Sequence, residues 1–142
     1  MTLLDTNVLI YASDSSSEHH RWARGVIADA VSSEGAAINA VVLAELCVGD
    51  TEPDAVADRV RSWGVHILDL PAAVAEPCAR AYAAYRLRRK NEGISAVPAT
   101  PLPDFFIGAH AEVMGWRIAT ADAGRFKTCF PSVPLVMPRK RS

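Results

Sequence analysis

Four acidic residues that are far apart in the sequence lie among apolar segments: Asp5, Glu45, Asp104 and Asp122. Carboxylates that a fold brings together repel one another and raise one another's pKa. A divalent cation relieves this repulsion, and Mg²⁺ and Mn²⁺ prefer oxygen ligands. A metal ion held in this way activates a water molecule and stabilises the leaving oxygen when a phosphodiester bond is hydrolysed. The four acids therefore predict metal-dependent phosphodiester hydrolysis, provided that the fold places them together.

Each acid also has a structural interpretation. Asp5 could shape a turn, although it interrupts an apolar segment where an unpaired buried charge is costly. Asp104 could cap a helix, which is worth about 1 kcal/mol. Glu45 could lie on a solvated face, but its neighbours on both sides are apolar, and Asp122 could form a turn. The prediction rests on the convergence of all four side chains.

The elements that must position these acids alternate between strands and helices. Apolar runs predict strands at residues 2–4 with the apolar residues that follow, 36–39, 65–70, 117–120 and 133–137. Helices are predicted at 41–48, 53–63, 72–90 and 104–114, and a long loop at 91–103. This alternation predicts an α/β fold with a mainly parallel sheet.

Two local signals concern helix ends. Ser15 and Glu18 have the spacing of a capping box, which predicts a helix that begins there and carries Trp22, Val26 and Ala30 on one face. Pro77 predicts either a kink within the helix at 72–90 or its true start.

The predicted topology lets the acids converge. Ligands of open α/β sheets gather at the carboxyl ends of the strands. Asp5 follows the first strand and Asp122 the fourth, so they flank the switch point if the strand order is 3-2-1-4-5. Glu45 lies on the first or second turn of the helix after the second strand, and Asp104 begins the helix that leads into the fourth. One rim of the sheet can hold all four.

Composition limits the classes of function. The 142 residues predict a single domain over 1–142, with residues 138–142 as a frayed basic tail. The net charge of −1 argues against nucleic-acid binding by overall charge, so any such contact needs a local patch. No window approaches the ~20 apolar residues of a membrane span. Motifs of serine hydrolases, dehydrogenases and nucleotide kinases are absent from the sequence.

The cysteines and histidines suggest no second site. Cys47, Cys78 and Cys129 are odd in number and have no CxxC pairing, which predicts reduced thiols in the cytoplasm. The four histidines show no HxxxH pairing, so we expect surface or satisfied core positions for them: His19, His20, His66 and His110.

Four motifs occur in order along the chain: DTNVL at 5–9, AEL at 44–46, Asp104-x-x-Ile107-x-Ala109-x-Ala111, and Thr120-x-Asp122 before Phe126. Together they resemble the PIN-domain family, over nearly the whole chain. Their order and spacing, and the chain length, are most similar to the VapC-type toxins of bacterial toxin–antitoxin pairs.

This resemblance implies strand order 3-2-1-4-5, an RNA endonuclease that depends on Mg²⁺ or Mn²⁺, a homodimer, and a cognate antitoxin that inhibits it. The family's acidic positions match Asp5, Glu45, Asp104 and Asp122 one by one. Polar residues that support the family's pocket match three more positions: Thr6, Asn7 and Thr120.

The sequence departs from the family at Arg125, where several relatives have another acid, so the number of metal ions, one or two, stays open.

Partners can be anticipated in part. An antitoxin arginine presented to Asp5 and Asp104 would match their carboxylates, while an amphipathic helix filled an apolar groove. The apolar faces of Trp22 and Trp63 favour a homodimer. A basic run ends the helix at 72–90 and either forms a solvated face or contacts RNA phosphates. The candidate RNA-binding residues in it are Arg86, Arg89 and Lys90.

Three other functions stay open on the sequence. One is a PIN nuclease of RNA processing that has no antitoxin. Another is a non-catalytic module that binds RNA or a protein on the same fold. The third, a phosphatase that begins with DxD, fits less well, because Asn7 stands where that mechanism needs its second Asp.

Overall fold

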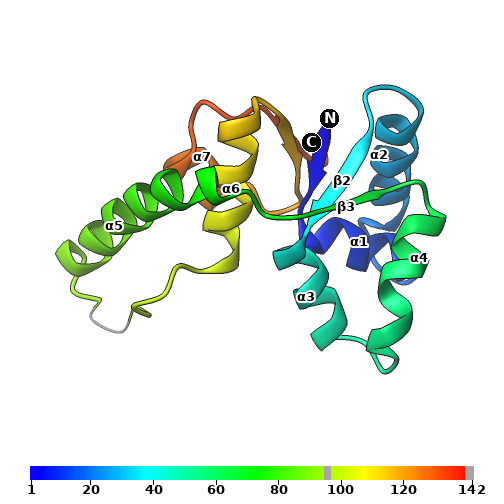
Figure 1. The fold of residues 1–142 in the computed structure, drawn as a ribbon, viewed down its shortest axis with the longest axis horizontal. Coiled ribbons are helices and arrows are strands. Elements are labelled where there is room, and N and C mark those ends of the chain that lie inside the picture. The colour runs from blue at the N-terminus through cyan, green and yellow to red at the C-terminus, as the bar shows by residue number, and fades with distance from the viewer. Residues whose placement is uncertain (95–96, 140–142) are drawn as a thin grey trace.

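The computed structural model describes residues 1–94 and 97–139, and a five-stranded sheet lies at its centre (Figure 1). The strands are β1 Thr2–Leu4, β2 Ala36–Asn39, β3 His66–Leu68, β4 Arg117–Ala119 and β5 Leu135–Val136. Their order is β3-β2-β1-β4-β5, and the four pairings between them are parallel. The predicted fold class and strand order are confirmed.

Helices cover both faces of this sheet. Figure 1 shows α5, α6 and α7 together on one side and α2, α3 and α4 on the other. The helices in the described residues are α1 Thr6–Ser13, α2 His20–Ser32, α3 Ala40–Val48, α4 Val56–Ser62, α5 Ala75–Asn91, α6 Pro103–Met114 and α7 Gly124–Cys129. Short 3₁₀ turns, Pro53–Ala55 and Ala72–Val74, precede α4 and α5.

Burial on both faces explains the composition of the central strands. Every residue of β1 and β2 is buried, as expected for parallel strands covered by helices. Leu4, Ile38 and Ile118 are fully enclosed, and burying each side chain contributes about 1.5–3 kcal/mol. The central strands therefore hold their carboxyl ends in fixed positions.

The first strand is shorter than predicted. It ends at Leu4, where the backbone N–H of Asp5 donates to the carbonyl of Ala119, and α1 follows directly. Val8 and Leu9 are buried from a helix rather than from a strand. The prediction was wrong beyond Leu4 because a short apolar run does not distinguish a strand from a buried helix.

The capping-box prediction is also wrong. Helix α2 begins at His20, and no side chain caps it. The Asp14 carboxylate instead accepts hydrogen bonds from the backbone N–H and the hydroxyl of Ser16, at 3.0 and 2.6 Å. This local turn takes the chain past Ser15 before a helix can begin.

Helix α2 buries a different stripe from the one predicted: Ala23, Ile27 and Ala30. Trp22 and Val26 are partly buried against the same core. Less apolar surface is therefore left over than the sequence suggested, and the homodimer stays a prediction, which light scattering tests.

Other sequence expectations can be placed. Pro77 is the third residue of α5, which agrees with its interpretation as a helix start. Residues 97–102 of the predicted loop have neither helix nor strand, while residues 95–96 lie outside the described residues, as do residues 140–142 of the predicted tail.

None of the helices in the described ranges is long and apolar enough to cross a membrane.

One buried glycine generates a stability prediction. A Cβ added to Gly108 of α6 would overlap the ring of Phe130, which is also buried. We expect Gly108→Ala to lower the free energy of unfolding by about 1–3 kcal/mol in urea denaturation. Gly25 of α2 has no atom near such a Cβ, so Gly25→Ala should raise the same quantity by about 0.5–1 kcal/mol. Equal effects of the two substitutions would contradict this packing.

Candidate functional site

A buried carboxylate lies where β1 ends. The Asp5 side chain is only 6% exposed. One of its oxygens accepts from the backbone N–H of Thr6 at 2.8 Å, and the other accepts from the Thr120 hydroxyl at 2.8 Å and the Asn7 amide at 3.2 Å. Burial raises the pKa of Asp5 to about 6, because these hydrogen bonds only partly offset the loss of hydration.

The polar residues that the sequence marked as supporting tie this carboxylate to the end of β4. Asn7 Oδ1 accepts from the backbone N–H of Ala121 at 3.2 Å. Thr120 Oγ1 accepts from the backbone N–H of Asp122 at 3.0 Å. The loop that carries Asp122 is therefore fastened to Asp5 through two side chains.

Glu45 reaches the same rim from α3. That helix begins at an Asn39 cap, whose side-chain oxygen accepts from the backbone N–H groups of Val41 and Val42, both at 3.1 Å. Glu45 follows on the second turn, and its Oε1 accepts from the Thr6 hydroxyl at 2.7 Å. Charge repulsion from Glu45 is among the causes that raise the pKa of Asp5.

Asp104 lies in the first turn of α6 but does not cap it. The cap position is Leu102, which makes no side-chain capping bond. Asp104 Oδ2 instead accepts from Arg125 Nη1 at 2.9 Å. Burial raises the pKa of Asp104, Arg125 lowers it, and repulsion from Asp122 raises it.

Arg125 is a functional neighbour whose contact the sequence did not indicate. Its guanidinium carbon lies 5.4 Å from the centroid of the Tyr85 ring, so an aromatic face supports it while it pairs with Asp104. Helix α7, which carries it, was not predicted because it is only six residues long.

The acids interact in pairs. Asp104 and Glu45 each repel Asp5, and Asp122 repels Asp104. Within residues 1–94 and 97–139, no three Asp, Glu, His or Cys side chains lie close enough together to hold one ion. The available donors are carboxylate oxygens, and Mg²⁺ usually takes one or two carboxylates and completes its shell with water. This donor set fits a hard divalent cation.

The structure separates the predicted RNA-binding residues. Arg89 lines a pocket of about 410 Å³ together with Asp104 and Asp122, whereas Arg86 and Lys90 line another pocket. Arg88, which was not among the candidates, lines the pocket of Arg89. Helical periodicity could have predicted this grouping from the sequence, because residues 85, 88, 89 and 92 share one face of a helix.

His110 is a core residue, as expected. It is 1% exposed, and its Nδ1 lies 3.2 Å from the side-chain nitrogen of Asn39.

Comparison with known proteins adds independent findings. A family model described as PIN domain matches residues 2–130. The fold is similar to VapBC from Salmonella typhimurium bound to DNA, with 20% identity, coverage of 96% of each chain and a TM-score of 0.64. It is also similar to FitAcB from Neisseria gonorrhoeae, with 26% identity, coverage of 95% of this chain and 96% of that chain, and a TM-score of 0.58.

A third similar structure is VapC20 of Mycobacterium tuberculosis, described as a toxin that cleaves the sarcin-ricin loop. The identity is 17%, the TM-score is 0.63, and the match covers 94% of this chain and 99% of that one. No curated protein matches the sequence.

The raised pKa of Asp5 predicts a dependence of stability on pH. The folded state binds this proton more tightly than the unfolded state, whose pKa is near 3.8, so stability falls as pH rises from 3.8 towards about 6. Asp5→Asn removes the titration. As pH rises from about 4 to about 7, the free energy of unfolding of the variant should increase by about 2–3 kcal/mol relative to that of wild type. Urea denaturation in the presence of chelator measures this difference. A difference that does not change with pH would contradict the burial of this charge.

Proposed function

Because the chain belongs to the PIN domain family, we propose that it is a metal-dependent endoribonuclease and the toxin of a VapBC-type toxin–antitoxin pair. The observation that carries the proposal is the meeting of Asp5, Glu45, Asp104 and Asp122 at one rim of the sheet, in pairs that repel one another. Such an arrangement is costly unless a cation completes it. RNA as the substrate is supported by the similarity to a toxin described as cleaving the sarcin-ricin loop.

The chain's own residues have distinct tasks in this proposal. Asp5 and Asp104 would hold Mg²⁺ or Mn²⁺, and Glu45 and Asp122 would add their negative charge to the site. A bound ion would supply an activated water and stabilise the leaving oxygen. Thr120 and Asn7 orient the Asp5 carboxylate, and Thr6 orients Glu45. Fixed carboxylates of this kind position an ion without reorganisation during the reaction.

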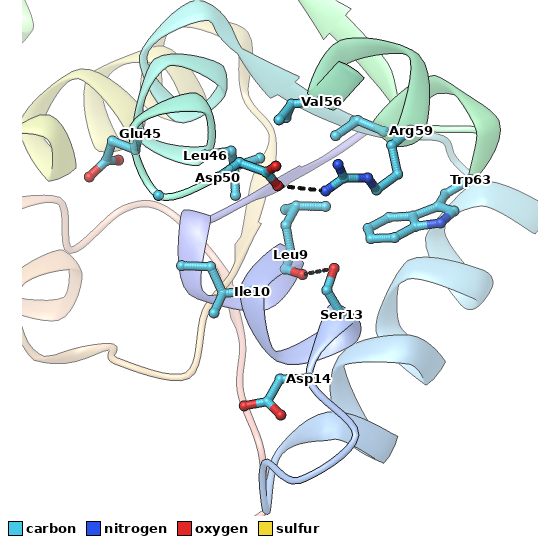
Figure 2. A pocket seen from close by; sticks show the side chains of 12 residues that line it. Leu9, Ile10, Ser13, Asp14, Glu45, Leu46, Asp50, Val56, Arg59 and Trp63 are labelled. Carbon is cyan, nitrogen blue, oxygen red and sulfur yellow. Dashed lines mark hydrogen bonds and ion pairs between the residues drawn. The ribbon is translucent and has the colours of Figure 1, made fainter. Parts of the chain in front are cut away.

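A groove near the rim supports the proposal of an antitoxin partner (Figure 2). It lies between α1, α3 and α4, and Glu45 and Trp63 lie at opposite ends of the view. Arg59 and Asp50, which form an ion pair at 2.7 Å, also line this groove. The apolar residues that line it are Leu9, Ile10, Leu46, Val56, Val60 and Trp63.

This groove, which we call the α1–α3–α4 groove, is suited to the apolar face of an amphipathic helix. An arginine beyond that helix would reach the acids. The contact between Arg125 and Asp104 already shows a guanidinium seated on one of them. Asp5, Glu45 and Asp122 would then be the remaining carboxylates for an inhibitor's arginine, unless it displaces Arg125 from Asp104.

The direct test of the function is cleavage of cellular RNA by purified protein. We expect cleavage with Mg²⁺ or Mn²⁺ and none in excess chelator. Asp5→Asn and Asp104→Asn should each lower the rate by at least ~100-fold and stay folded, since changes even around a metal ligand cost roughly 10–100-fold. Asp58→Asn is the control, because its side chain is 91% exposed. Cleavage in chelator would refute the metal-dependent mechanism.

Arg125 predicts a measurable effect on metal affinity. Its guanidinium competes with a cation for Asp104 Oδ2, so Arg125→Gln should tighten Mn²⁺ binding by about fivefold in calorimetry. This corresponds to the ~1 kcal/mol that a partly exposed ion pair contributes at most. Arg117→Gln, which breaks a pair with Glu34 elsewhere, is the control. Weaker Mn²⁺ binding by the Arg125 variant would contradict the competition.

The groove predicts which surface the antitoxin needs. Ile10 lines it and is 51% exposed. Ile10→Asp should weaken antitoxin binding by at least about tenfold, because it places a charge in an apolar contact. Val48→Asp is the matched control, since Val48 is 88% exposed and does not line the groove. Equal affinities for the two variants in calorimetry would place the partner elsewhere.

A further inference from the structure

An acidic rim raises a problem for a nuclease, because its substrate is also anionic. Asp104 and Asp122 repel the phosphates on either side of the bond to be cut. A metal ion offsets this charge only where it is bound. Neighbouring phosphates need protein cations beside the rim, and the net charge of −1 means that these must come from a local patch.

Such cations line the 410 Å³ pocket that contains Asp104 and Asp122. Arg88 and Arg89 come from α5, and Arg125 comes from α7. The guanidinium carbons of Arg89 and Arg125 lie 5.9 and 5.4 Å from the centroid of the Tyr85 ring. The ring limits the positions that these two flexible side chains can take.

The three arginines differ in how far their donors are already used. Arg125 pairs with Asp104. Arg88 donates to the Cys129 sulfur at 3.3 Å, and a thiol is a weak acceptor. Arg89 makes an exposed pair with Glu92 at 3.2 Å, and its buried Nε has no hydrogen-bond partner in the described part of the chain. A guanidinium group carries five N–H donors, so Arg88 and Arg89 keep donors for an anion beyond these contacts.

The same helix directs its other basic residues elsewhere. Arg86 and Lys90 line a pocket with Leu87, Ile94 and Val97, which contains none of the acids. The basic run thus splits between two faces of α5. Only one of them adjoins the rim.

We infer that Arg88 and Arg89 form a phosphate-binding subsite for single-stranded RNA beside the acids. A backbone phosphate next to the scissile one would accept hydrogen bonds from both guanidinium groups, with Arg125 at the boundary between subsite and rim. The phosphate oxygens of RNA can accept two parallel hydrogen bonds from one arginine, which makes arginine a suitable residue to bind them. This inference rests on the proposed nuclease function and assigns the substrate contacts of the same site.

Two double variants test the subsite, and each removes two positive charges from α5. Arg88→Gln/Arg89→Gln changes the face beside the acids, and Arg86→Gln/Lys90→Gln changes the other face. The probe is a short fluorescein-labelled single-stranded RNA, and its affinity is measured by anisotropy in chelator over a range of salt concentrations. Thermal unfolding checks that both proteins are folded.

We expect the Arg88/Arg89 variant to bind RNA at least about tenfold more weakly, as for lost hydrogen bonds to a charged group. Its slope of log affinity against log salt should fall by about 0.7, the value for one single-strand phosphate contact. The Arg86/Lys90 variant should lose less than about twofold. Arg88→Lys/Arg89→Lys keeps the charge and should recover only part of the affinity, because lysine lacks the fork.

Equal losses of RNA affinity in the two double variants would overturn the subsite, because binding would then depend only on the overall charge of the protein. Unchanged RNA affinity, with weaker binding of the antitoxin, would overturn it in favour of a protein-binding face. Both results leave the nuclease proposal intact, because wild-type cleavage is measured separately. Tight RNA binding that depends on Arg88 and Arg89, without cleavage in Mn²⁺, would instead refute the nuclease and keep the subsite.

Discussion

The buried carboxylate of Asp5 is the constraint on which the rest of the site depends. Its backbone N–H closes the contact between β1 and β4, and its side chain accepts three hydrogen bonds. These hydrogen bonds only partly replace the hydration that the carboxylate loses on burial, and the pKa of Asp5 is therefore raised. Asn7 and Thr120 serve both the carboxylate and the loop of Asp122, so the position of one acid fixes that of another. The parallel order of β2, β1 and β4 then brings α3 and α6 to the same rim.

Charge balance connects this constraint to function. The rim gathers carboxylates that repel one another, and the cation nearest to them in the described residues is Arg125 on Asp104. A divalent ion, an inhibitor's arginine and Arg125 would all compete for the same oxygens. In the proposed function, substrate phosphates would need the opposite charge nearby, and Arg88 and Arg89 line the pocket beside the acids. The site would then use its arginines for two different purposes.

The sheet and the order of its strands could be predicted from the sequence, but the exact helix starts and individual side-chain contacts could not. Alternating apolar runs predicted the parallel sheet. Asp5 and Asp122 follow the neighbouring strands β1 and β4, as expected if the strand order is 3-2-1-4-5. The start of α2 was missed because Asp14 forms a competing turn. The contact of Arg125 was missed because it depends on how α7 packs against α6, which no short motif encodes. To predict which basic residues of α5 face the acids, the position of each residue around the helix is needed as well as the composition of the run.

We propose that the acids at this rim form the site of a divalent cation. Anomalous diffraction from crystals soaked in Mn²⁺ tests this proposal, because the signal locates the metal itself. We expect one strong peak within about 2.1 Å of carboxylate oxygens of Asp5 and Asp104, with Arg125 displaced from the oxygen of Asp104 that it now contacts. A peak at some other cluster of acids, or full occupancy of the rim by Arg125 with no Mn²⁺ bound, would contradict it.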